Sequence, residues 1–178
     1  LEASQVTLRE ACGNTVRNVT ASPMAGLDPE EPFNVLPWAD ALWKFFLRNP
    51  VCQEMGRKFK VAFSSSKRDT ALAVMHDLGV IPVLGPNDEP GFKVLVAGGL
   101  GAQPAPADVL HEWLPAEELI PWTEAILRVF DREGDRSKRQ KARLKFLYQS
   151  MGREALLQAA ARELEALSGT FPVVEPSN

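Results

Sequence analysis

The feature that most constrains the fold is the alternation in GRKFKVAFSSS, residues 56–66. Side chains in a β-strand point to opposite faces in turn, so every second residue shares a face. One face of a strand over 58–63 is apolar and predicts burial in a core: Phe59, Val61 and Phe63. The other face carries Lys58 and Lys60 beside a small residue. It is either a solvated surface, where lysines discourage edge pairing, or the floor of an anion site.

The segments around this strand predict an α+β fold, a mixed β-sheet with helices. Short apolar runs predict further strands over 80–84 and 92–99. Apolar stripes at helical spacing predict helices over 37–49, 69–79, 121–134, 136–149 and 153–168. The succession of strand, helix and strand over 58–84 indicates a crossover unit.

Three stretches of different character suggest the domain organisation. Residues 1–35 are rich in Gly, Asn, Thr and Pro, and predict an irregular loop segment. Residues 36–168 hold the predicted strands and helices and read as one α/β domain. Residues 169–178 lose periodicity and predict an exit linker to further sequence.

Composition excludes several classes of protein. The net charge of −3 gives the chain as a whole no electrostatic attraction to nucleic acid or to a membrane surface. No apolar run approaches the roughly 18 residues of a membrane-spanning helix. Two cysteines and two histidines, none in close ligand spacing, argue against a zinc site and favour a reducing, cytoplasmic location.

Two loops are candidates for binding an anion. Arg17 lies in CGNTVRNVT among small polar residues, where a guanidinium and backbone N–H groups are both available to an oxyanion. The loop AGGLGAQP, 97–104, follows a predicted strand, and its glycines let backbone approach a ligand closely. The alternatives are an ordinary surface arginine and a plain strand-to-loop turn.

The run DREGDRSKRQKARLK carries seven basic residues between Arg132 and Lys145. Leu144, Leu147 and Tyr148 fall on one helical face, so we interpret the run as an amphipathic helix with a solvated, charged outer face. The alternative is contact with RNA or phosphate, which gives a second hypothesis for the whole chain: a non-catalytic anion- or RNA-binding α/β module.

Four segments, taken in order, resemble the sirohaem-dependent sulfite and nitrite reductase family. They are REACGNTVRNVTASPMAG (9–26), GRKFKVAFSSSKRDTALAVMHDLGVIP (56–82), GFKVLVAGGLGAQP (91–104) and VFDREGDRSKRQKARLKFL (129–147). The resemblance implies the nitrite/sulfite reductase fold. It also implies a fragment of an assimilatory-type enzyme that reduces sulfite to sulfide by six electrons.

The resemblance also implies site residues. Arg17, Lys58 and Lys60 match the cations that line the distal face of sirohaem in this family, where they bind the oxyanion and supply protons. Residues along the carboxylates of the cofactor would be Asn18, Arg57, Gly98, Gly99, Gly101 and Gln103, together with those three cations. Lysine rather than asparagine at Lys60 favours sulfite, and nitrite is the alternative substrate. No metal ligand is predicted in this chain.

The sequence departs from the family at the cluster ligands. Members carry C-x5-C and C-x3-C pairs that hold a [4Fe–4S] cluster, and this chain has neither pair. We therefore expect sirohaem and the cluster to be completed by remaining domains, and the isolated fragment to be inactive and to bind no cofactor tightly. The implied partners are sulfite or nitrite and a ferredoxin or flavoprotein electron donor, with no nucleic acid and no membrane.

Overall fold

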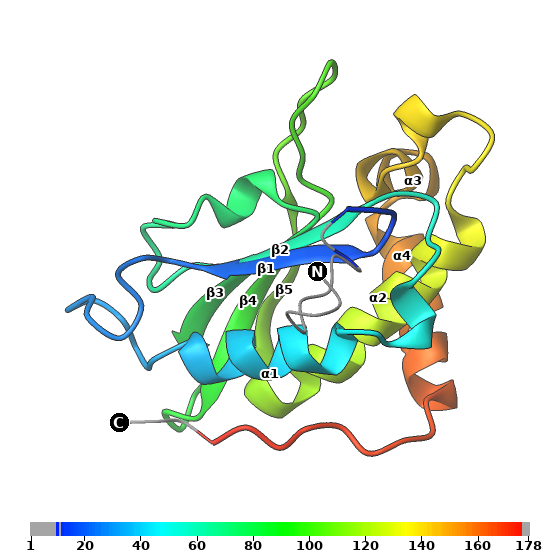
Figure 1. Cartoon of the computed structure of the whole chain (residues 1–178). Coiled ribbons are helices and arrows are strands. Elements are labelled where there is room, and N and C mark those ends of the chain that lie inside the picture. Colours follow the sequence, from blue (N-terminus) through cyan, green and yellow to red (C-terminus); the bar gives the residue numbers. More distant parts are fainter. Residues whose placement is uncertain (1–9, 11, 176–178) are drawn as a thin grey trace, which may run out of the picture.

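A computed structural model describes residue 10 and residues 12–175. Its centre is a five-stranded sheet in the order β1-β2-β3-β4-β5 (Figure 1). The strands are β1 (Val16–Ala21), β2 (Phe59–Phe63), β3 (Leu78–Leu84), β4 (Pro90–Val96) and β5 (Asp108–Pro115). The pairs β1–β2 and β2–β3 are parallel, whereas β3–β4 and β4–β5 are antiparallel. The predicted α+β fold with a mixed sheet is confirmed.

The apolar face of the sheet holds the main core. Phe59, Val61 and Phe63 are all fully buried there, as the alternation predicted. Helices α1 (Leu36–Phe46) and α2 (Leu119–Glu133) cover this face (Figure 1). Burying one large apolar side chain contributes about 1.5–3 kcal/mol, so this face supplies much of the stability.

Two further helices complete the C-terminal half. They are α3 (Leu144–Met151) and α4 (Arg153–Ala166), with Gly152 between them at a φ of 86°. Arg132 of α2 forms an ion pair with Glu163 of α4, which fastens α4 to α2. Four single 3-10 turns lie between the main elements: η2 (Pro50–Cys52), η3 (Ala73–Met75), η4 (Ala116–Glu118) and η5 (Arg139–Lys141).

The prediction that residues 1–35 are irregular is wrong for β1, Val16–Ala21. This short segment becomes a strand because it pairs with β2, whose residues lie about forty positions later in the chain. Such a partner cannot be seen from local composition. Residues 1–9 and 11 of the predicted loop segment, and residues 176–178 of the predicted exit linker, lie outside the described residues.

The helix predicted over 69–79 is also wrong. Leu72 adopts a left-handed conformation with a φ of 54°, and only the single turn η3 follows it. The Asp69 carboxylate accepts hydrogen bonds from the Ala73 and Val74 backbone N–H groups at 2.7 and 3.1 Å, which holds the tight turn. Gly79 belongs to β3, where a Cβ would lie 2.6 Å from the carbonyl oxygen of Ala73. The crossover still joins two parallel neighbours, β2 and β3, as predicted.

Two other predictions need correction. The helix predicted over 136–149 begins only at Leu144, and the basic residues before it form a turn and η5. The Arg136 guanidinium donates to the Glu54 carbonyl and to Asp131, so it pins this stretch away from a helical path. Strand β5 was not predicted, since it follows a proline-rich loop and half of its residues are partly exposed.

Candidate functional site

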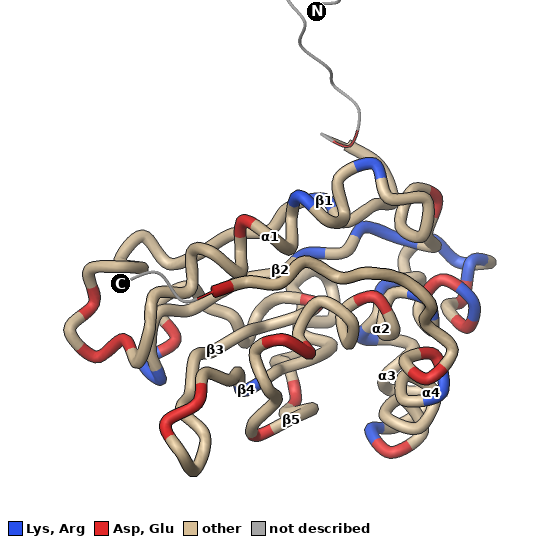
Figure 2. Tube along the Cα trace, turned by 90° about the horizontal axis from the view of Figure 1, so that it is seen from below, with Lys and Arg blue, Asp and Glu red and all other residues tan. Residues whose placement is uncertain are grey.

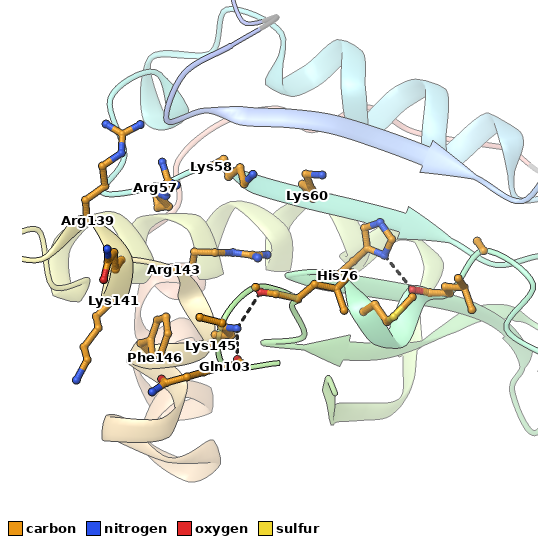
Figure 3. A pocket seen from close by; sticks show the side chains of 17 residues that line it. Arg57, Lys58, Lys60, His76, Gln103, Arg139, Lys141, Arg143, Lys145 and Phe146 are labelled. Atoms are coloured by element: carbon orange, nitrogen blue, oxygen red, sulfur yellow. Dashed lines mark hydrogen bonds between the residues drawn. The ribbon is translucent and has the colours of Figure 1, made fainter. Parts of the chain in front are cut away.

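A cavity of about 690 Å³ opens over the cationic face of β2 (Figure 3). Residues from four segments of the chain line it: 57–60, 71–76, 100–103 and 139–146. Seven of the lining residues are cationic: Arg57, Lys58, Lys60, Arg139, Lys141, Arg143 and Lys145. None of the described residues that line it is acidic. In Figure 2 most of the Lys and Arg segments likewise gather toward the end of the molecule where α3 lies.

The two lysines predicted from the alternation lie on the same side of this cavity (Figure 3). Partial burial lowers the pKa of Lys58 from its ordinary value, and the charges of Lys60 and Arg17 lower it further. A cation held in such a field favours a bound anion, and its lowered pKa makes it a better proton donor than a free lysine. The interpretation of this face as a plain solvated surface is therefore not supported.

Arg17 and Asn18 come to the same strand from β1. The register pairs Val16 with Phe59 and Asn18 with Lys60, so Arg17 is the extra residue of a β-bulge. Arg17 Nη2 donates to the Gly13 carbonyl at 2.5 Å, while its Nε is buried without a partner. Arg17 is not among the lining residues, but its charge helps to lower the pKa of Lys58. The Asn18 amide oxygen is likewise buried and has no hydrogen-bond partner.

Arg57 lines the cavity beside Lys58 (Figure 3). Burial lowers the pKa of Arg57, and the charges of Arg139, Arg17 and Arg143 lower it further. The guanidinium remains charged, because an arginine pKa lies far above neutrality. These like charges lie close together on the cavity wall, where none of the described lining residues is an acid.

The glycine loop divides into two parts. Gly101 and Gln103 line the cavity, and Gly101 has a φ of 109° with open space where a Cβ would stand. Gly98 and Gly99 do not line it. A Cβ on Gly98 would lie 2.5 Å from the Val74 carbonyl oxygen, so this glycine is required by close packing of backbone. Cofactor contact by the glycines and by Gln103 stays a prediction.

The interpretation of the basic run 132–145 as a solvated helix face is wrong at its C-terminal end. Instead of lying on a solvated helix face, Lys145 is buried and its ammonium group donates to backbone carbonyls of the glycine loop. The distances are 3.3 Å to Gly99, 3.1 Å to Leu100 and 2.5 Å to Gln103. Arg143 is only 15% exposed and pairs with a buried carboxylate. Helical periodicity missed both residues because the helix starts between them.

His76 is a further lining residue that the sequence did not indicate. Its Nδ1 lies 2.9 Å from the Leu72 carbonyl oxygen, which assigns the proton to Nδ1 and leaves Nε2 free (Figure 3). The left-handed turn at Leu72 brings that carbonyl within reach. The expected helix over 69–79 would have obscured this arrangement.

The described residues fit a polyanionic ligand but not an iron–sulfur cluster. Cluster ligation needs several thiolates close together. Cys52 is buried, and burial raises the pKa of its thiol to about 11, while Cys12 is exposed. Among the described residues no three His, Cys, Asp or Glu side chains are grouped to hold a metal ion. None of the helices in the described part of the chain is long and apolar enough to cross a membrane.

Comparisons with known proteins show which family the chain resembles. Residues 12–167 match the family described as "Nitrite and sulphite reductase 4Fe-4S domain". "Sulfite reductase [ferredoxin] 1" of Mycolicibacterium paratuberculosis is 33% identical over 92% of this chain and 29% of its own length. "Ferredoxin--nitrite reductase" of Synechococcus elongatus is 33% identical over 90% of this chain and 32% of its own length. The chain thus spans about a third of each relative.

Solved structures show the same fold. The structure of the Mycobacterium tuberculosis NirA protein superimposes with a TM-score of 0.80 and 29% identity, over 94% of this chain and 30% of that one. Dissimilatory sulfite reductase I matches with a TM-score of 0.69 over 84% of this chain and 53% of that one. At 14% identity this second similarity shows the fold alone.

Proposed function

Because the chain belongs to the nitrite and sulphite reductase 4Fe-4S domain family, we propose that it forms the cationic wall of the sirohaem site in a sulfite reductase. The observation that carries this proposal is the cavity of about 690 Å³ lined by seven cations and, within the described residues, by no acid. Sirohaem carries carboxylates around its ring, and a pocket of this charge neutralises them.

The residues divide into two proposed roles. Arg57 and Arg139 hold carboxylates of the cofactor, since a guanidinium matches a carboxylate in two parallel hydrogen bonds, and Lys141 adds an ammonium charge. Lys58 and Lys60 face the anionic substrate from the cavity wall, and Arg17, which does not line the cavity, is assigned to the same substrate through its charge beside Lys58. Sirohaem, when bound, supplies the iron centre at which electrons reach the substrate. The cluster that accompanies it takes its ligands from residues other than the described ones.

Protons are the second requirement of the reaction, because each sulfite oxygen that is removed leaves as water. Lys58 is suited to release a proton, since burial and neighbouring cations lower its pKa. The same cations stabilise negative charge as electrons arrive. Lys60 favours sulfite over nitrite as substrate. Nitrite is the second candidate, because a nitrite reductase is as similar to the chain as a sulfite reductase.

The names of the relatives support a proposal for the electron donor, and the cysteines support one for the location. Both relatives are named as ferredoxin enzymes, and we propose ferredoxin as the donor, with a flavoprotein as the alternative. The two cysteines are free thiols, which suits a reducing, cytoplasmic compartment. A nucleic-acid-binding module is disfavoured because the cations face a cavity instead of forming a convex surface stripe.

The proposal is tested by the substitution Lys60→Met in the full-length enzyme that contains this chain. We expect sulfite reduction with reduced methyl viologen to fall by about 100-fold, which is the scale of losing one preorganised group at a reacting centre. Lys93→Met is the matched control, because Lys93 lies on the same face of the sheet but outside the cavity. Unchanged sulfite turnover in Lys60→Met would refute the assigned role, and a selective loss with nitrite would favour the second candidate.

A further inference from the structure

One buried acid lies beneath the cationic cavity. Asp77 immediately precedes β3 and is fully buried. Its carboxylate accepts two hydrogen bonds of 2.8 Å from Arg143 Nη2 and a longer one of 3.3 Å from Arg143 Nε. The Lys60 backbone N–H donates to the same carboxylate at 3.1 Å. Burial raises the pKa of Asp77, and the Arg143 guanidinium opposes this effect.

These contacts join three separate walls of the cavity. Lys60 belongs to β2, Arg143 directly precedes α3, and the glycine loop rests on the guanidinium from a third side. A Cβ on Gly99 would lie only 2.9 Å from Arg143 Nη1, so the loop backbone sits directly against the pair. The backbone of Asp77 also accepts a hydrogen bond of 2.9 Å from Ala97 N–H, at the start of this loop.

We propose that Asp77 is a positioning residue, which fixes Arg143, the Lys60 backbone and the Gly99 loop so that the cations of the cavity converge on a bound polyanion. This inference rests on the proposed function of the cavity. Arg143 alone cannot hold the cations of the cavity in place, because a guanidinium without its carboxylate is repelled by Arg57 and by its other cationic neighbours. The buried carboxylate both neutralises that repulsion and sets the geometry of the fork.

For the substitution Asp77→Asn, a positioning role and simple electrostatics predict opposite changes in the affinity for an anion. Asp77→Asn removes a negative charge beneath the cavity, which on Coulomb's law alone strengthens the binding of an anion. If Asp77 positions the cations, the same change weakens binding, because the asparagine N–H₂ faces guanidinium donors and cannot hold them.

The test uses uroporphyrin I, a fluorescent porphyrin with carboxylates on every pyrrole ring, titrated into this chain. We expect Asp77→Asn to bind about tenfold more weakly than the original chain, because the cations of the cavity are displaced but not removed. Asp28→Asn is the matched control. Its side chain is only 2% exposed and pairs with Arg68 at 2.9 Å, but it lies outside the cavity. Equal or tighter binding by Asp77→Asn would overturn the proposal.

A second measurement tests the positioning role of Asp77 without using uroporphyrin I. Amide hydrogen exchange should accelerate at Lys60 and over 99–103 in Asp77→Asn, but not in Asp28→Asn. Unchanged exchange at these amides would overturn the positioning role. If the original chain does not bind uroporphyrin even weakly, the proposed function fails, while the exchange result still decides the positioning role. If Asp77→Asn does not fold, Arg143→Lys keeps the charge, loses the fork, and is expected to give the same pattern.

Discussion

Residues 58–63, which comprise β2 and Lys58 directly before it, alternate between two faces that have opposite roles. Phe59, Val61 and Phe63 are completely buried against α1 and α2 and stabilise the fold. Lys58 and Lys60 face a cavity that gathers cations, and partial burial with mutual repulsion lowers the pKa of Lys58. The apolar face therefore stabilises the folded chain, whereas the clustered charges of the cationic face destabilise it.

The difference between the faces lies in how each charge is compensated. Arg143 and Lys145 are satisfied within the chain, by a carboxylate and by backbone carbonyls. Arg57, Lys58 and Lys60 take part in none of the ion pairs formed by the described residues. Charges left uncompensated in a concave site are typical of a binding site, because a ligand of opposite charge completes them.

The largest effect is expected on the apolar face. Phe59→Ala should lower the free energy of unfolding by about 3–5 kcal/mol, because it leaves a cavity in a fully buried site. Urea unfolding followed by circular dichroism measures this loss. A loss below about 1 kcal/mol would show that the apolar face does not stabilise the fold more than the cationic face does, and would contradict the contrast between them.

An intermediate effect is expected from pH on the cationic face. A bound polyanion raises the pKa of Lys58 above its lowered value in the free chain, so binding takes up protons. Affinity for uroporphyrin I should therefore fall as the pH rises between those two pKa values, by at most about tenfold per pH unit for a single proton. Lys58→Met should flatten this dependence, and a dependence that survives in Lys58→Met would assign the proton to another group.

The smallest effect is a gain in stability from Lys58→Met. A lysine with a lowered pKa binds fewer protons in the folded than in the unfolded chain, so folding is opposed while the ammonium stays charged. Methionine keeps much of the stem and removes the charge. We expect Tm to rise by about 2–4 °C, equivalent to about 1 kcal/mol for a chain of this size.

The control for that gain is Lys93→Met. Lys93 pairs with Glu112 at 2.9 Å on the same face of the sheet, so its removal should leave Tm unchanged or lower it slightly. A fall in Tm for Lys58→Met equal to that of the control would contradict the view that the cavity costs stability.

The sequence predicted what depends on local pattern. The alternation over 58–63 located both faces of β2, and the resemblance brought Arg17 to the same region, where the β1–β2 register places it. The missed residues depend on contacts between distant segments. Asp77 and Arg143 are far apart in the chain and form a pair only in the fold. The sequence predicted Asp77 within a helix over 69–79 that does not form, and it predicted Arg143 within a helix that starts only after it. β1 likewise required a partner strand to be recognised.

The most direct test of the central claim is a fluorescence titration of uroporphyrin I into this chain and into the double variant Lys58→Glu, Lys60→Glu. The account predicts binding by the original chain that weakens with added salt, and a loss of at least about 100-fold in the double variant, because two attractive charges become repulsive. Lys93→Glu should bind as the original chain does. Equal affinity in the double variant would contradict the claim that the cationic face of β2 is an anion-binding wall.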